Sequence, residues 1–330
     1  MKIDSLNWVL AMSLVFAATA CGGTSDAGSG TAGTGGSAGN RGTGGAGGAG
    51  TARDAMGYVI GDFGFLYPDM DPETYPDMEN TDFGEEGVRG FDLDGLVGGG
   101  TEPGTCLHED FNAPDGTPGI DYGLWSFIRQ YEPLRQGQLI DSVIKSAVKN
   151  GEMSIVMELG GVDDMVNDDN VTVQIFSTEN SPLVGTDGEV LPNSTLAVHP
   201  DTKYHSTIAT GSIKDGVLEA GPFDVSLKFF IQIVDSDMLL TDVRIRLTLG
   251  DGTASGILSG HWSVTQIHDI IGKPTSDNGP SPDIGAAGFN YTEFLEAMEA
   301  ADASYDQESA TCTAFTTIFR LGAVTDFLTD

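Results

Sequence analysis

Basic residues are scarce in this chain of 330 residues. Lysine and arginine number 15 against 49 aspartates and glutamates, so the formal net charge is −34. A nucleic-acid-binding protein needs basic side chains to neutralise phosphates, and a protein held on anionic lipid by charge needs a polybasic segment. The composition therefore excludes nucleic acid as a partner and excludes attachment to a membrane surface through positive charge.

Cysteine is equally scarce, with the three residues Cys21, Cys106 and Cys312. So few cysteines exclude a disulfide-dense scaffold and a zinc protein built on cysteine ligands. If Cys21 carries another modification, Cys106 and Cys312 remain as an even pair. In an oxidising compartment we predict a disulfide between these two, which would join the start of the folded domain to its end. The alternative is two separate buried thiols.

An apolar run long enough for a retained membrane helix is missing at the N-terminus. The run at residues 6–20 has about 15 residues, whereas a membrane-spanning helix needs about 20. It ends in Ala18-Thr19-Ala20-Cys21, the pattern of an export signal. This ending resembles a bacterial lipobox, in which the cysteine is acylated, although that pattern prefers Leu where this chain has Ala18. We therefore predict a signal peptide at residues 1–20 and a lipidated Cys21; the alternative is an ordinary signal peptidase site.

Glycine, in contrast, is abundant, with 46 residues, and many of them lie between residues 22 and 50. This stretch has almost no side chain to bury, so we predict a flexible tether at residues 21–50. A lipidated cysteine followed by such a tether resembles the uncharacterised surface lipoproteins of myxobacteria and their relatives. The resemblance implies a lipid-anchored protein of the cell envelope, at the outer membrane or cell surface of a Gram-negative bacterium. It implies a sorting class and no particular activity.

Residues 51–105 combine acidic side chains with aromatic ones. Pro68, Pro72 and Pro76 exclude a helix around them, because proline lacks the backbone N–H that a helix interior needs. We predict an acidic disordered linker here. The alternative is an extended arm whose aromatic side chains dock on the domain or on a partner.

Residues 106–330 are predicted to form one β-rich globular domain. Apolar residues at helical spacing indicate helices at 138–149, 289–301 and 311–327, and Asp121 is expected to cap a further short helix. Strands are indicated at 154–159, 171–177, 213–218, 225–234, 243–249 and 257–267, with turns at 214–216, 235–237 and 251–252. The predicted fold class is mainly β: an antiparallel, jelly-roll-like β-sandwich with flanking helices at both ends, preceded by a disordered N-terminal region.

Oxygen-bearing side chains cluster at the start of this domain, at Asp110, Asn112, Asp115 and Asp121. Their spacing resembles the calcium loops of EF-hand and dockerin proteins, in which one short turn supplies several of the six to eight oxygen ligands. These four residues are the predicted metal ligands, with calcium as the cofactor. The alternative is a set of Asx turns that accept backbone N–H groups. A second acidic loop, residues 163–170, is interpreted as a solvated turn or as another cation site.

Motifs of established catalytic chemistry are missing outside the glycine-rich tether: there is no G-x-S-x-G, H-E-x-x-H or P-loop sequence. His261 and His268 are expected to be structural. The leading prediction is a non-enzymatic lipoprotein that presents a β-sandwich binding or structural module. Its partners would be the membrane, through the lipid, and a carbohydrate or envelope protein. One alternative is a tethered hydrolase of envelope or extracellular polymers with an acid-lined cleft. Another is a calcium-dependent carbohydrate-binding module with an exposed aromatic platform near Trp125 or Trp262.

Overall fold

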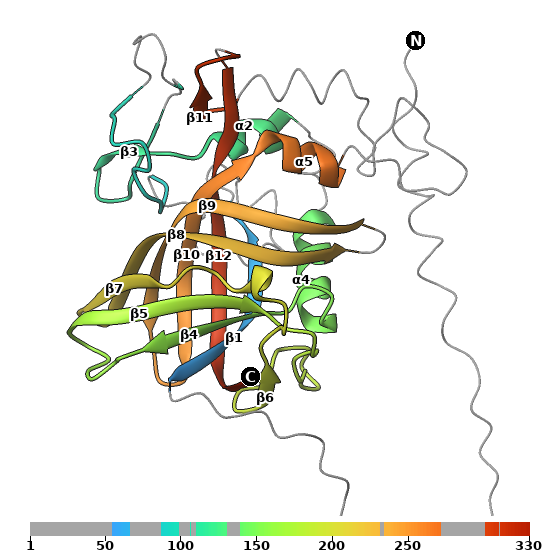
Figure 1. The fold of residues 1–330 in the computed structure, drawn as a ribbon. Coiled ribbons are helices and arrows are strands. Elements are labelled where there is room, and N and C mark those ends of the chain that lie inside the picture. The colour runs from blue at the N-terminus through green and yellow to red at the C-terminus, as the bar shows by residue number, and fades with distance from the viewer. Residues whose placement is uncertain are drawn as a thin grey trace, which may run out of the picture. The chain divides into compact units, whose positions relative to one another are not determined.

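The computed structural model describes a folded region that contains most of the C-terminal part of the chain (Figure 1). The described residues are 55–66, 87–98, 106, 110–130, 139–231, 234–271, 301–309 and 311–330. They all belong to the compact unit Gly48–Asp330. The predicted signal peptide, Cys21, the tether at 21–50 and the predicted helix at 289–301 up to residue 300 lie outside the described residues. Within the described residues, no helix is long and apolar enough to cross a membrane.

Strands predominate among the described elements, which confirms the mainly β class. The strands are β1 (Met56–Phe65), β2 (Phe111–Asn112), β3 (Pro118–Ile120), β4 (Ile155–Gly160), β5 (Asp168–Ser177), β6 (Thr195–Ala197), β7 (Ala209–Lys214), β8 (Val217–Ile231), β9 (Val234–Leu249), β10 (Thr253–Ser263), β11 (Ala303–Asp306) and β12 (Thr311–Thr329). The helices are α2 (Gly123–Gln130), α4 (Leu139–Asn150) and α5 (Val264–Ile271), with the short 3-10 helix η1 (Thr202–Tyr204).

Eight of the strands close into a ring. Neighbours are hydrogen-bonded in the order β1, β4, β5, β7, β8, β9, β10 and β12, and β12 pairs again with β1. Every pair in this ring is antiparallel, as predicted. The two packed sheets of the predicted sandwich are not found, because the hydrogen bonds run around one sheet that closes on itself. Closure gives every ring strand a hydrogen-bonded neighbour on both sides over at least part of its length.

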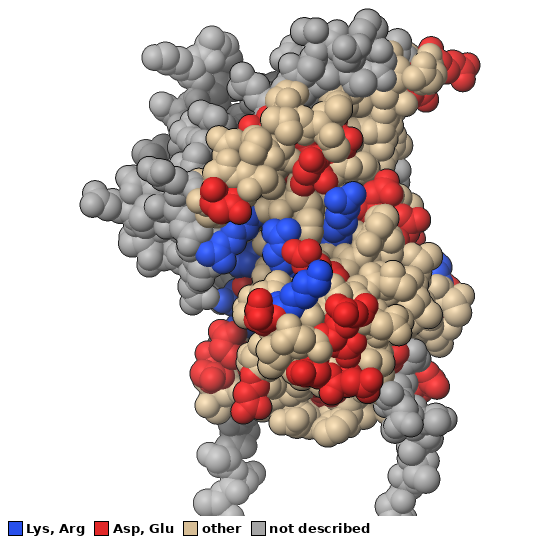
Figure 2. Space-filling view, turned by 90° about the vertical axis from the view of Figure 1, so that its left-hand side faces the viewer, with Lys and Arg blue, Asp and Glu red and all other residues tan. Residues whose placement is uncertain are grey.

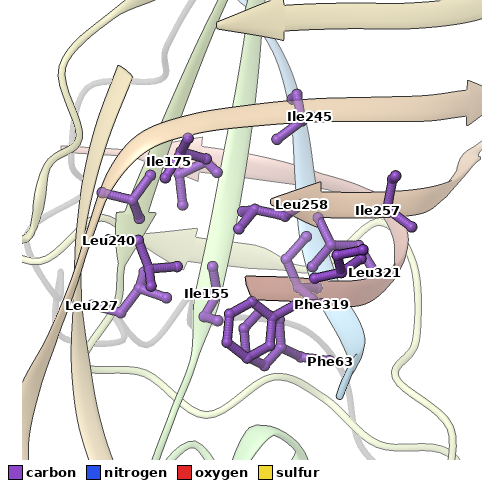
Figure 3. Packing of buried hydrophobic residues seen from close by; sticks show 14 of the residues in the cluster. Phe63, Ile155, Ile175, Leu227, Leu240, Ile245, Ile257, Leu258, Phe319 and Leu321 are labelled. Atoms are coloured by element: carbon purple, nitrogen blue, oxygen red, sulfur yellow. The ribbon is translucent and has the colours of Figure 1, made fainter. Parts of the chain in front are cut away.

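The inside of the ring is filled by apolar side chains. Every ring strand contributes to one buried cluster, for example through Tyr58, Met157, Val173, Ile213, Val225, Ile245, Leu258 and Phe319. The rings of Phe63 on β1 and Phe319 on β12 stack with their centroids 4.8 Å apart. Figure 3 shows Ile155, Leu227 and Leu240 coming from three different strands and lying close together. An eight-stranded closed sheet has an interior that side chains can fill, and packing of this kind supplies most of its stability.

The predicted helix at 311–327 is wrong, because these residues form β12. Phe315, Ile318 and Phe319 have helical spacing in the sequence, but all three are buried in a strand between β10 and β1. A strand buried on both faces has apolar residues at consecutive positions. Its periodicity therefore cannot be told from that of a buried helix.

The prediction of a disordered linker at 51–105 is wrong for residues 56–65, which form the ring strand β1. This strand pairs with β4 on one side and β12 on the other. Its β-branched and aromatic residues suit a strand, and both faces are buried: Tyr58 belongs to the main core cluster and Val59 to a second, smaller cluster outside the ring. The folded domain therefore begins well before Cys106, as the docked-arm alternative anticipated.

Several local predictions are confirmed. Helix α4 ends at Asn150, followed by Gly151 with φ 78°, as the Asn-Gly stop signal indicated. Asp215 and Gly216, with φ 51° and 78°, form the turn between β7 and β8, as expected for a two-residue hairpin turn. The strand predicted at 243–249 is also confirmed as part of β9, and its side chains Val243, Ile245 and Leu247 are buried. The turn predicted at 235–237 is wrong, because these residues lie within β9.

The predicted disulfide is present between Cys106 and Cys312, whose Cα atoms are 5.8 Å apart. It joins a point before β2 to the start of β12, where β11 also pairs. The short predicted helix is present as α2, but Asp121 does not cap it. The backbone N–H of Gly123 instead donates to Oγ1 of Thr316, which also hydrogen-bonds to the buried carboxylate of Asp302.

Two segments outside the ring complete the domain. Residues 87–98, here called the strap, lie against β9 and β12. Residues 199–208, here called the seam loop, lie between β5 and β8 at the place where β7 has not yet begun.

Candidate cation site

The strap is fastened to the outer face of the ring by arginines of β9. Nη1 of Arg244 donates to the carbonyl of Asp92 at 3.0 Å, and Nη1 of Arg246 donates to the carbonyl of Gly90 at 3.2 Å. The guanidinium of Arg246 also lies 4.5 Å from the ring centre of Phe91. Figure 2 shows basic side chains gathered in the middle of one face of the molecule, with acidic ones around them. Arg246 in addition pairs with Glu219 of β8, so this arginine contacts both the strap and an acidic side chain of the ring.

Three carboxylates meet where the strap approaches the segment before α2. One oxygen each from Asp92, Asp94 and Asp121 can be chosen so that all lie within 4.8 Å of one another. Oxygens bound to one cation at about 2.4 Å are at most about 4.8 Å apart, which is the separation of two opposite ligands. The spacing of the three groups therefore fits a single hard cation.

Each of the three carboxylates uses one oxygen to accept backbone N–H groups. Oδ1 of Asp92 accepts from Gly95 at 2.6 Å, and Oδ1 of Asp94 accepts from Leu96 at 2.7 Å. Oδ2 of Asp121 accepts from Leu93 at 2.5 Å and from Asp94 at 3.2 Å. Among the described residues, no hydrogen bond reaches the other oxygen of any of the three. One oxygen of each group therefore remains for a ligand.

The local sequence Asp92-Leu93-Asp94-Gly95 is suited to this geometry. Gly95 has φ 78°, a conformation that glycine adopts without strain, and it turns the chain so that the Leu96 carbonyl follows the two acids. A Cβ atom on Gly119 would lie 3.2 Å from the carbonyl oxygen of Leu96 and 3.5 Å from Oδ2 of Asp92, so both oxygens lie next to Gly119. Calcium loops of the EF-hand type likewise place two acids, a glycine and a backbone carbonyl in this order.

Burial, with smaller contributions from the nearby carboxylates of Asp94 and Asp110, raises the pKa of Asp121 to about 7, although the hydrogen bonds from Leu93 and Asp94 act in the opposite direction. The residue is 6% exposed. A carboxylate in this position is costly to ionise without a positive charge nearby. A divalent cation would supply that charge. The three carboxylate oxygens could provide three of the six to eight ligands that calcium takes, with water completing the shell.

Of the four metal ligands predicted from the sequence, Asp121 alone belongs to this cluster. The carboxylate of Asp110 accepts the backbone N–H of Gly98. Asn112 lies in β2, where its carbonyl accepts the N–H of Val88 at 2.7 Å. Asp115 accepts the N–H of Thr117 at 2.9 Å in an Asx turn, and hydrogen bonds from Thr117 lower its pKa. The structure does not bring the four side chains together around one point.

Asp92 and Asp94 were missed because residues 51–105 were treated as one acidic linker. The Asp-x-Asp-Gly pattern at 92–95 is a local signal that could have identified them. Their convergence with Asp121 could not be predicted, because the sequence separations of 29 and 27 residues are bridged by the fold alone.

The second acidic loop has the features of the solvated turn. Asp168 accepts the N–H of Asp163 at 2.7 Å and that of Asn170 at 3.0 Å, and Asp164 accepts the N–H of Val166 at 2.8 Å. Backbone hydrogen bonds lower the pKa of Asp168 accordingly. The carboxylates of this loop shape the turn between β4 and β5 rather than converging on one point.

His261, Trp125 and Trp262, which were singled out in the sequence, are surrounded by other parts of the fold. His261 lies on β10, with Nδ1 3.5 Å from Oδ2 of Asp242, and burial lowers its pKa. His268 lies in α5, on another element. Trp125 and Trp262 are 2% and 4% exposed, so neither forms part of an exposed aromatic platform.

Comparison with protein-family models, with curated proteins and with solved structures found no match. The resemblance to bacterial surface lipoproteins therefore depends on the N-terminal sequence features alone.

Proposed function

We propose that this chain is a lipoprotein of the cell envelope, at the outer membrane or cell surface of a Gram-negative bacterium. Acyl chains on Cys21 anchor it, residues 21–50 act as a tether, and the closed sheet is a non-enzymatic module that binds a partner or contributes to envelope structure. The observation that carries this proposal is the disulfide between Cys106 and Cys312. Disulfides persist in oxidising compartments, and this one leaves Cys21 as the third of three cysteines, at the end of an export signal.

The surroundings of the charged groups support a module without catalysis. Arg244 and Arg246 donate to strap carbonyls, and the strap carboxylates accept backbone N–H groups. Most of the hydrogen bonds of these arginines and carboxylates therefore fix the strap in place. The alternative, a tethered hydrolase of envelope or extracellular polymers, requires a pair of carboxylates or an activated nucleophile at an open cleft.

Calcium is the proposed cofactor, bound by Asp92, Asp94 and Asp121. The specific observation in its favour is that three carboxylate oxygens lie within one coordination sphere. In this role the ion would join the strap to the segment before α2 and so stabilise the folded form by mass action. A calcium-dependent carbohydrate-binding module is a less favoured alternative, because Trp125 and Trp262 are buried.

Membrane fractionation of the full-length protein in a Gram-negative host tests the anchor. The wild type and the control Ser29→Ala, altered in the same glycine-rich stretch, should fractionate with membranes and partition into detergent. Cys21→Ser should be released, because about 0.8 kcal/mol of membrane affinity is lost for each acyl CH₂ group. A Cys21→Ser protein that stays in the detergent phase would overturn the anchor.

Thermal unfolding tests the calcium site. Calcium at millimolar concentration should raise the melting temperature above that in sodium chloride of equal ionic strength, and Asp92→Asn should remove the difference. Asp115→Asn is the matched control, since Asp115 lies in an exposed Asx turn outside the cluster. Loss of the calcium effect in Asp115→Asn but not in Asp92→Asn would favour the loop at 110–121 instead. Equal melting temperatures in both salts would overturn calcium binding.

A further inference from the structure

The ring depends on the seam loop for its closure between β5 and β8. Strand β7 begins at Ala209 and pairs with β5 up to Val173 and with β8 up to Ala220. Beyond these residues, no described strand lies between β5 and β8. The seam loop occupies this place: Ser206 donates its N–H to the carbonyl of Ile175 at 2.8 Å and accepts the N–H of Ile175 on its hydroxyl at 2.9 Å.

The same loop reaches β8 and β9. Thr207 donates its N–H to the carbonyl of Asp224 at 3.1 Å, and its hydroxyl accepts the N–H of Asp224 at 3.0 Å. The hydroxyl of Tyr204 donates to Asp237 on β9 at 2.8 Å. Ser177 on β5 also accepts the N–H of Lys228 on β8 at 2.9 Å. The hydrogen bonds of the seam loop to β5 and β8 thus replace those that another strand between them would make.

His199 lies at the root of this loop in a defined protonation state. The residue is 7% exposed, and its backbone N–H donates to the carbonyl of Ser177. Nδ1 accepts the backbone N–H of Asp201 at 3.1 Å, so Nδ1 carries no proton. The proton is therefore on Nε2, which lies 3.4 Å from Oε1 of Glu179. The carbonyl of His199 in turn accepts from Nε2 of His205 at 2.6 Å.

We propose that protonation of His199 unfastens the seam loop and loosens the ring between β5 and β8 in mildly acidic solution. A second proton can go only to Nδ1, where it would face the N–H of Asp201. The hydrogen bond would become a contact between two donors, and a positive charge would be placed in a buried ring. The turn of η1, whose cap is Asp201, begins at this bond, so the loop would lose its fixed starting point.

The charged groups around His199 do not cancel this effect. Glu179, at the end of β5, favours the charged imidazole, but its side chain is 60% exposed and the interaction is screened by water. Lys203 pairs with Asp237 of β9 at 3.3 Å, and Asp237 is opposite Lys228 on β8. Asp201 uses Oδ1 to accept the N–H of Lys203. His205 donates through Nε2, and it can keep this bond when protonated.

Hydrogen exchange of individual amides tests this proposal on the whole protein. We expect the protection factors of Asp201, Ser206 and Lys228 to fall by about five- to tenfold between about pH 7.5 and about pH 5.5, the factor that corresponds to one lost hydrogen bond. His199→Asn should abolish the fall, because Oδ1 of asparagine can occupy the place of Nδ1 as an acceptor and does not titrate. His205→Gln is the matched control, since its side-chain amide can still donate to the carbonyl of residue 199, and it should respond like the wild type.

An equal fall in His199→Asn and in the wild type would overturn the proposal, as would unchanged protection in the wild type. If His199→Asn does not fold, ¹⁵N chemical shifts of the wild-type imidazoles give the same decision. Protonation of Nδ1 of His199 must then coincide with the loss of protection at Asp201. Loss of protection without protonation at Nδ1 would reject the mechanism.

Discussion

The strap and the seam loop both lie outside the ring and complete it, but they are held by opposite kinds of chemistry. The strap is fastened by charged groups: two arginines of β9 and three carboxylates that lie close together. The seam loop is fastened mainly by neutral groups, among them the unprotonated Nδ1 of His199 and the hydroxyl of Ser206. Like charges weaken the first arrangement, whereas an added charge weakens the second.

This difference predicts opposite responses to pH. The pKa of Asp121 in the folded protein is about 7, above its ordinary value of 3.8, so the folded form binds its proton more tightly than the unfolded form. The strap should therefore lose stability as the pH rises from about 4 to about 7 in the absence of a cation. Under the proposal for the seam loop, a proton on Nδ1 of His199 would remove the hydrogen bond from Asp201, so this loop should lose stability as the pH falls.

The largest expected effect is that of removing the disulfide, which fastens the chain near the strap and is remote from the seam loop in sequence. The double variant Cys106→Ser/Cys312→Ser should lower the free energy of unfolding by about 2–5 kcal/mol, because the unfolded chain loses a long closed loop. Urea denaturation measures this, and hydrogen exchange should show a larger local loss at Leu93 than at Ser206. Equal local losses at both amides would show that the two segments are not independent.

The next largest effect concerns the close approach of the strap to the ring. A Cβ on Gly90 would lie 2.4 Å from Cγ2 of Ile120 and 2.8 Å from Cδ1 of Ile318. Gly90→Val should therefore lift the strap and cost about 3 kcal/mol of unfolding free energy, measured by denaturant titration. Gly116→Ala is the control, since nothing lies within 4 Å of its added Cβ and its φ of 85° is the main cost. A Gly90→Val protein no less stable than Gly116→Ala would contradict the packing described for the strap.

Removal of the Ser206 hydroxyl tests how much one hydrogen bond of the seam loop contributes to stability. Ser206→Ala leaves the buried N–H of Ile175 without its acceptor, so we expect a loss of about 1–3 kcal/mol in unfolding free energy. Ser226→Ala on β8 serves as the control, because among the described residues its hydroxyl makes no hydrogen bond. Denaturant titrations that place both variants within about 0.5 kcal/mol of the wild type would mean that the seam does not depend on this bond.

The smallest effect sharpens the comparison of pH responses. Asp121→Asn keeps an oxygen that can accept from Leu93 and Asp94 but cannot ionise. In a calcium-free buffer, we compare the free energies of unfolding of the variant and the wild type. The difference between them should shift in favour of the variant by about 1–2 kcal/mol between about pH 4.5 and about pH 8. Parallel stability curves for the two proteins across this range would show that Asp121 ionises in the folded state without cost. A calcium titration of both proteins at the higher pH should stabilise the wild type more.

Local patterns in the sequence predicted those elements whose two faces differ. In β9, buried Val243, Ile245 and Leu247 alternate with Arg244 and Arg246, and this contrast indicates a strand with one apolar face. Helix α4 was predicted for the same reason, with apolar residues on one side and a glycine after its last residue. The count of cysteines likewise predicted the disulfide between Cys106 and Cys312.

Elements buried on both faces, and groups brought together from distant positions, were decided by the tertiary structure. Strand β12 has apolar residues at consecutive positions, and its neighbours β1 and β10 make it a strand rather than the helix that its spacing suggested. The ring closes because β1, from a segment of acidic composition, supplies the last partner for β12. Asp121 likewise lies near Asp92 and Asp94 only because the folded chain brings distant segments together. The sequence by itself determines which side chains are present and how apolar and polar ones alternate. Contacts between residues far apart in the sequence depend on how the whole chain folds.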